Sequence, residues 1–187
     1  MLRQASRLLP FENDVPAGVL ITAELIWNWD GWLELSYGIL MPGPRGISDL
    51  VLPEPLLDGP QSNGHQRDGL WTTTCCEAFL AIPGENHYWE FNLAPNGDWA
   101  AYRFQDYRRG QHNQDLNAAP DIHLKRWHHQ LRLDARLSLE PWWPNGQCPD
   151  LSITCVLQDQ KRGLSHWALR HEGEEADFHC RRNFLRP

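Results

Sequence analysis

Polar side chains that could hold a small molecule recur between residues 71 and 103, close to aromatic rings. The candidate ligand-binding residues are Trp71, Glu77, Glu90, Asn92, Trp99 and Arg103. Carboxylates, amides and guanidinium groups hydrogen-bond to sugar hydroxyls, and an aromatic ring stacks on the apolar face of a sugar ring. This set therefore predicts a site for a carbohydrate or a similar polar, ring-bearing metabolite.

These residues can act together only if a hairpin places them on one face. The stretch "YWEFNLAPNGDWAAYRF" (88–104) has two alternating runs around Asn96-Gly97, which is typical of a two-residue type I′ turn. That turn would set Phe91 opposite Tyr102 on the core face and Glu90 opposite Arg103 on the polar face. The same pairing would also serve as a cross-strand ion pair worth roughly 0.2 to 1 kcal/mol, so a binding surface and a solvated ladder both remain open.

The strand before this hairpin, around "CCEAFLAI" (75–82), extends the same sheet. Joined through the loop 83–86, it would place Glu77 opposite Asn92 and Phe79 opposite Glu90. The polar face of a three-stranded meander would then carry all the acidic candidates. Trp71 would reach it from the long Pro- and Gly-rich loop 41–71, in which one short strand is expected around Leu50 to Leu52.

Short alternating segments separated by Gly, Pro and Asn/Asp recur along the chain, and none of ten or more residues has helical periodicity. An earlier hairpin should use the three-residue loop 29–31, with Gly31 left-handed, to pair Trp27 with Leu33 and Leu25 with Leu35. The segments "WHHQLRLDARLSLE", "DLSITCVLQD" and "SHWAL" add further strands. We expect an all-β, two-sheet antiparallel sandwich of jelly-roll type, with residues 1–187 forming one domain.

Composition limits the partners of the chain. Its 187 residues carry a net charge of −7, which argues against nucleic acid and anionic membranes as partners. No apolar run reaches the length of a membrane span and no secretory signal opens the chain, so a cytoplasmic location is expected. Five cysteines, an odd number with no CxxC spacing, predict reduced thiols and no zinc site.

Three stretches of the sequence resemble those of a known protein family. The stretches "RDGLWTTTCCEAFLAI", "YWEFNLAPNGDWAAYRFQDYRRG" and "HWALRHEGEEADFHCRRNF" resemble the bacterial DOMON-like domain proteins, which are related in fold to family 9 carbohydrate-binding modules. Cys76 departs from the aromatic residue expected after the first cysteine of that motif. The resemblance implies a β-sandwich and a non-catalytic module that binds a sugar or haem. Fold similarity alone is an associational argument for function.

Haem is the first alternative, because relatives in the wider superfamily use Met and His as axial ligands. Apart from the initiator, Met41 is the only methionine, and His65, His87 and His179 are among its possible partners. No axial-ligand motif is present, so no cofactor is predicted.

An enzyme and a protein-interaction module are the remaining alternatives. Glu77 and Glu90 could form a glycosidase pair, but Arg103 beside Glu90 would favour its ionised form, and no other catalytic motif is found. We therefore expect no catalytic residues. Trp142 and Trp143 could anchor a partner protein, or they could cap one end of the core. The sequence leaves the oligomeric state open.

Overall fold

The structure is a computed structural model that describes residues 1–54, 59–61 and 64–187. Twelve strands are found among these residues, and every pair of neighbouring strands is antiparallel. The strands are β1 (Leu2–Pro10), β2 (Leu20–Trp27), β3 (Trp32–Leu40), β4 (Gly59–Gln61), β5 (Cys75–Ala81), β6 (Tyr88–Leu93), β7 (Trp99–Phe104), β8 (His112–Asn113), β9 (Asp121–Arg126), β10 (Gln130–Ser138), β11 (Asp150–Asp159) and β12 (Gly163–Ala168). Three short 3-10 helices complete the described elements: η1 (Gly46–Asp49), η2 (Leu70–Thr72) and η3 (Arg181–Asn183). The predicted all-β class is confirmed.

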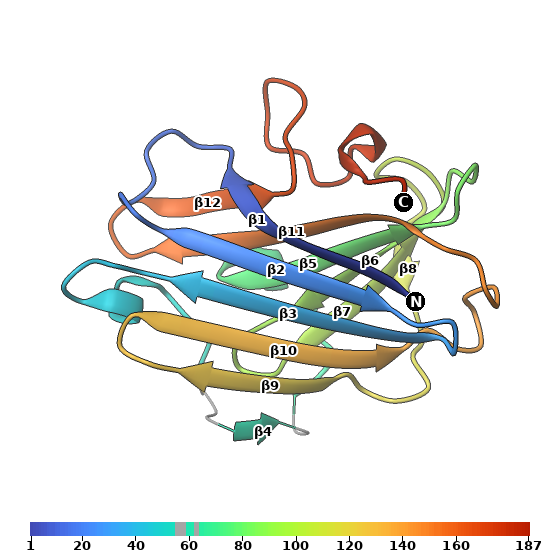
Figure 1. The fold of residues 1–187 in the computed structure, drawn as a ribbon, viewed down its shortest axis with the longest axis horizontal. Helices are drawn as coiled ribbons and strands as arrows, with labels where there is room; N and C mark the ends of the chain where they lie inside the picture. The colour runs from blue at the N-terminus through green and yellow to red at the C-terminus, as the bar shows by residue number, and fades with distance from the viewer. Residues whose placement is uncertain (55–58, 62–63) are drawn as a thin grey trace.

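One strand joins the two layers of the fold. Residues Leu2 to Leu8 of β1 pair with β2, whereas Leu9 and Pro10 pair with β12. The sheet is therefore continuous, in the order β4-β9-β10-β3-β2-β1-β12-β11-β5-β6-β7-β8, and it folds over itself at β1. In Figure 1, β2, β3 and β10 cross in front of β5, β6 and β7. The sandwich is thus one continuous curled sheet with two packed layers, and its expected division into two sheets is not confirmed.

The two layers share one hydrophobic core. The first layer contains β4, β9, β10, β3 and β2, and the second contains β12, β11, β5, β6, β7 and β8. Leu25, Leu35 and Leu133 reach the core from the first layer, and Phe91 and Ile153 reach it from the second. Each of these side chains is at most 1% exposed. Such a core excludes water from both layers, and the burial of apolar surface is the main stabilising contribution.

The hairpin between β2 and β3 has the predicted register. Trp27 pairs with Leu33 and Leu25 with Leu35, around a loop in which Gly31 has φ 80°. The alternation predicted for this segment is also confirmed, because Leu131, Leu133, Ala135 and Leu137 of β10 and Leu139 just after it are all buried.

The predicted turn between β6 and β7 is wrong. The Ala94 N–H donates to the Asp98 carbonyl (2.8 Å), and the Gly97 N–H donates to the Ala94 carbonyl (2.9 Å). The loop therefore contains three residues, Pro95, Asn96 and Gly97. Gly97 has φ 86°, but Asn96 is not left-handed, whereas a type I′ turn needs positive φ at both central positions. Both hairpins use the same kind of loop.

This extra loop residue shifts β7 by one position. Glu90 lies opposite Tyr102, and Arg103 lies opposite Trp89. A shift of one residue moves every side chain of a strand to the other face. The apolar pattern could not reveal the shift, because five of the six residues of β7 are buried and both of its faces are covered.

Other parts of the chain also differ from the sequence-based assignments. Leu50 forms only an isolated bridge with Asp159, so no strand covers Leu50 to Leu52, and β1 was not predicted. The Trp142 ring stacks on Trp89 with a centroid separation of 5.1 Å, and Trp143 is 4% exposed, so this pair packs against the core. All five cysteines are free. No helix in the described part of the chain is long and apolar enough to cross a membrane.

We predict that Gly97→Ala lowers the free energy of unfolding by about 1 to 2 kcal/mol, because a side chain disfavours the left-handed conformation at φ 86°. Urea denaturation would measure this loss. Gly43→Ala is the matched control, since a Cβ there would meet Asp49 Oδ2 at an ordinary 3.5 Å. Equal losses in the two variants would contradict the left-handed conformation of Gly97.

Candidate ligand-binding site

A cavity of about 310 Å³ lies on the outer face of the second layer. The floor of the cavity is formed by side chains of β5, β6, β7 and β11. The turn at 106–111 and the C-terminal segment 169–187 enclose its sides, and Trp71 of η2 stands at its edge. The polar and aromatic groups that line it include Trp71, Glu77, Phe79, Glu90, Arg108 and His179.

Aromatic packing holds the C-terminal segment against this face. Phe79 contacts the rings of Phe178 and His179, with centroids 6.5 and 5.3 Å away. Phe184 packs against Phe79 and Tyr88. Phe79, Tyr88, Phe178 and Phe184 belong to a second apolar cluster, separate from the core between the layers. Edge-to-face ring pairs add to the burial of apolar surface, so the wall of the cavity is a packed structure.

Glu77 is the most deeply buried acid of the cavity, with 2% of its surface exposed. Thr154 Oγ1 donates a hydrogen bond to Glu77 Oε2 (3.2 Å), but Oε1 is buried and has no hydrogen-bond partner among the described residues. Burial, followed by the negative charge of Glu90, raises the pKa of Glu77 well above its ordinary value. Glu77 therefore offers unused hydrogen-bonding capacity to the cavity.

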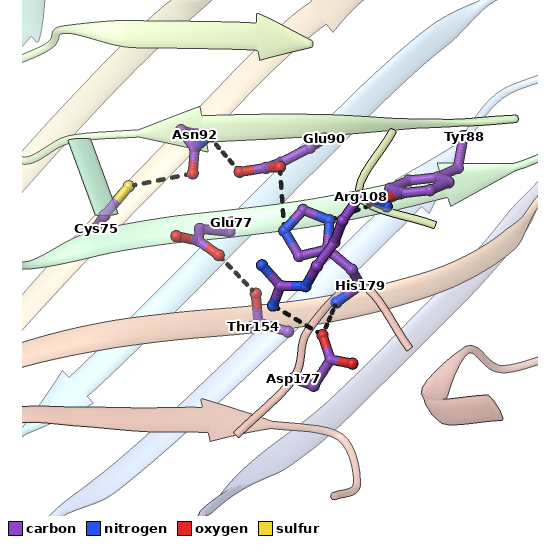
Figure 2. A network of polar contacts seen from close by, with 9 residues as sticks. All are labelled: Cys75, Glu77, Tyr88, Glu90, Asn92, Arg108, Thr154, Asp177 and His179. Carbon is purple, nitrogen blue, oxygen red and sulfur yellow. Dashed lines mark hydrogen bonds and ion pairs between the residues drawn. The ribbon is translucent and has the colours of Figure 1, made fainter. Parts of the chain in front are cut away.

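Glu90 is 5% exposed and lies on the neighbouring strand. Asn92 Nδ2 donates to Glu90 Oε1 (2.7 Å), and Glu90 Oε2 lies 3.8 Å from His179 Nε2 (Figure 2). Burial raises the pKa of Glu90 to about 7, although the hydrogen bond from Asn92 and the charge of Arg108 act in the opposite direction. This carboxyl thus changes its charge near neutral pH.

His179 is held by a short chain of hydrogen bonds. The Arg108 backbone N–H donates to the Tyr88 hydroxyl (3.2 Å), and that hydroxyl lies 2.8 Å from His179 Nδ1. We assign the Tyr88 hydrogen to Nδ1, which leaves the ring proton on Nε2, facing Glu90. Burial, with a smaller contribution from Arg108, lowers the pKa of His179 to about 4. The imidazole is therefore uncharged at neutral pH.

Arg108 has an unusual backbone at the edge of the cavity. Its φ is 52°, and among the described residues it is the only non-glycine with positive φ. Its guanidinium forms an ion pair with Asp177 (2.9 Å), and the Tyr107 hydroxyl donates to the same carboxylate (2.8 Å). Strained backbone of this kind is concentrated at functional sites.

The structure brings together only part of the predicted set. Glu77, Glu90 and Trp71 line the cavity, and Asn92 lies behind Glu90 and orients it. Trp99 and Arg103 lie on the opposite face of β7 because of the register shift described above. Trp99 is 8% exposed and belongs to the central core, and the Arg103 guanidinium packs 5.6 Å from the Trp89 ring centre. Their placement beside Glu90 was wrong.

Four further residues of this site were not predicted from the sequence: Tyr88, Arg108, Phe178 and His179. One signal was available, since the "DFH" segment at 177–179 belongs to the motifs that carry the DOMON-like resemblance. Met41, considered above as a haem ligand, is buried in the central core, whereas His179 lies in the outer cavity. Within the described ranges, no three His, Cys, Asp or Glu side chains are grouped so that they could hold a metal ion.

Comparisons with known proteins show similarity of fold. No protein-family model and no curated protein sequence matches the chain. A crystal structure of a Bacteroides uniformis protein, proposed to bind carbohydrate, matches with a TM-score of 0.61 and 11% identity, over 97% of this chain and 84% of that one. A family 9 carbohydrate-binding module from Caldicellulosiruptor kristjanssonii, solved with cellotriose, matches with a TM-score of 0.48 and 14% identity, over 88% and 72% of the two chains. The same kind of module with glucose gives a TM-score of 0.46 at 14% identity, over 83% and 69%.

We predict that ionisation of Glu90 contributes to the pH dependence of the free energy of unfolding. Because its folded pKa of about 7 exceeds its ordinary value of 4.5, the folded state binds more protons between these values, and stability falls as the pH rises. Glu90→Gln should remove up to about 1.4 kcal/mol of this loss per pH unit. Urea denaturation across this range would measure it, with the exposed Glu174→Gln as control. Parallel profiles for wild type and Glu90→Gln would contradict the prediction.

Proposed function

We propose that this protein is a ligand-binding module whose outer cavity holds a carbohydrate or a similar polar, ring-bearing metabolite. The observation that carries the proposal is Glu77 Oε1, a buried carboxyl oxygen at the cavity with no hydrogen-bond partner among the described residues. Leaving a buried polar atom unsatisfied costs about 1 to 3 kcal/mol, and a bound ligand that donates a hydrogen bond would remove that cost.

The size and composition of the cavity support a ligand of about one sugar ring. Small-molecule sites have volumes of about 300 to 1,000 Å³ and combine apolar walls with a few placed polar groups. Here the volume is about 310 Å³, and Phe79, Phe104 and Phe178 stand beside the two glutamates. Trp71, which is 41% exposed, supplies a ring on which a sugar could stack.

We also propose that the chain is a DOMON-like domain. The motifs behind that resemblance supply residues of the cavity, because Glu77 and Glu90 come from two of them and His179 from the third. The Bacteroides uniformis protein shares the fold at 11% identity, so the assignment rests on the motifs. Function depends on the site more than on the fold, so the cavity carries the argument.

A glycosidase-type enzyme is the second candidate. Arg103, which argued against it at the level of sequence, lies on the other face of the sheet, and the pKa of Glu90 is raised to about 7. A carboxyl that holds its proton near neutral pH is suited to general-acid catalysis. An enzyme should lose turnover and keep substrate binding in Glu90→Gln, whereas a binding module has no turnover to lose.

The first experiment is a thermal-shift screen against monosaccharides, oligosaccharides, nucleotide sugars and haemin, followed by calorimetry on each ligand that raises the melting temperature.

We predict that Glu77→Leu and Trp71→Ala each weaken sugar binding, by about tenfold or more for Glu77→Leu, since it loses a buried hydrogen bond. Trp29→Ala, at an exposed tryptophan in the β2–β3 loop, is the control and should bind normally. A sugar that binds wild type and both cavity variants equally would place its site elsewhere, and a response to haemin alone would favour a haem-binding domain.

A further inference from the structure

The charges around the cavity do not balance. Two buried carboxyl groups, Glu77 and Glu90, belong to neighbouring strands, and Glu77 lies opposite Asn92, two positions from Glu90. Two buried carboxylates so close together repel one another, and neither is easily ionised without a cation. The question is whether the protein itself supplies that cation.

The cationic groups nearest the cavity are occupied or uncharged. Arg108 is ion-paired with Asp177 at 2.9 Å, and Figure 2 shows its guanidinium meeting that carboxylate. His166 Nδ1 lies 2.7 Å from Glu12 Oε1, so any charge on it has its own partner. His179, the nearest base to Glu90, is uncharged at neutral pH because burial lowers its pKa to about 4. Within the described residues, no ion pair reaches Glu77.

We propose that the ligand carries a basic nitrogen whose ammonium group pairs with Glu77 and Glu90, as in an amino sugar. The sugar part of this proposal rests on the proposed function, but the ammonium part rests on the carboxyl pair alone. An ammonium group has three donors and no acceptor. Glu77 Oε1 has no partner among the described residues, and Glu90 Oε2 has only His179 at 3.8 Å, so both oxygens can accept.

The aromatic walls favour the same ligand. Phe79, Phe104 and Trp71 line the cavity around the two carboxyl groups. A cation near an aromatic face is attracted by the ring quadrupole, and the attraction is strongest where water is excluded. Carboxylates together with aromatic rings thus distinguish an ammonium group from a hydroxyl group, whereas hydrogen bonds alone would accept either.

The test uses four probes on the full chain, with calorimetry at about pH 7. Glucose has hydroxyl groups and no amine, whereas glucosamine has both. N-acetylglucosamine has its nitrogen at the same position as glucosamine, but as an uncharged amide. Cyclohexylamine has a ring and an amine but no hydroxyl groups. We predict that glucosamine binds at least about tenfold more tightly than glucose and N-acetylglucosamine, which is the ratio expected for one charge-assisted interaction.

The four probes separate this proposal from the proposed function. Glucose or N-acetylglucosamine binding as tightly as glucosamine would overturn the ammonium inference and leave the sugar-binding function standing. Cyclohexylamine binding when no sugar binds would support the ammonium inference and overturn the sugar-binding function. Binding by none of the four would count against both.

Glu77→Gln removes the negative charge at residue 77 and keeps a side chain that can form hydrogen bonds. Gln keeps a polar side chain of nearly the same size, so neutral sugars should bind as they do to wild type, while the preference for glucosamine should fall about tenfold. The exposed Glu174→Gln makes the same acid-to-amide change outside the cavity and should keep the preference. A preference for glucosamine that survives in Glu77→Gln would overturn the pairing with Glu77.

Proton release gives an independent readout. At about pH 6, a pKa of about 7 keeps Glu90 largely protonated in the empty cavity, so a bound ammonium group should displace a proton into the buffer. Calorimetry of glucosamine in two buffers of different ionisation enthalpy would detect that release, and glucose should show none. Glucosamine binding without proton release would contradict the formation of an ammonium–carboxylate pair.

Discussion

The register between β6 and β7 is the constraint on which the candidate site depends. Pro95, Asn96 and Gly97 form a three-residue loop, and this loop places Tyr102 and Phe104 on the same face as Glu90. With one loop residue fewer, Arg103 would stand beside Glu90 and add a cation to a cavity whose own arginine, Arg108, is paired with Asp177. The charge of the site is therefore decided by the geometry of a turn, because side chains alternate strictly along a strand.

The candidate site also depends on the C-terminal segment, which covers the outer face of the second layer. The outer face of an antiparallel layer is often exposed to water, but here Phe178, His179 and Phe184 pack over it. That covering buries Glu77 and Glu90 and raises the pKa of both carboxyls. Without it the same acids would form a solvated ladder, which was the alternative left open by the sequence. Packing by the C-terminal segment thus converts a polar strip into a cavity.

Alternation predicted much of the fold. The all-β class, the first hairpin and the buried face of β10 were predicted correctly, because one face of these strands is more apolar than the other. The pairing of Glu77 with Asn92 was also correct, although β5 and β6 are buried on both faces, because the predicted length of the loop 83–86 gave the right register. The failures have a common origin. β7 is apolar on both faces, and β1 pairs at its two ends with strands of different layers, so neither gives a single clear pattern.

The sequence by itself determined the class of fold, the main strands and three cavity residues, Trp71, Glu77 and Glu90, because these follow from local periodicity and residue chemistry. Only the tertiary structure decided which other residues join them. Tyr88 and His179 are 91 positions apart, and Arg108 reaches the cavity from a turn with positive φ. Contacts of this kind depend on how a segment distant in sequence packs, and the local periodicity of apolar residues does not predict that packing.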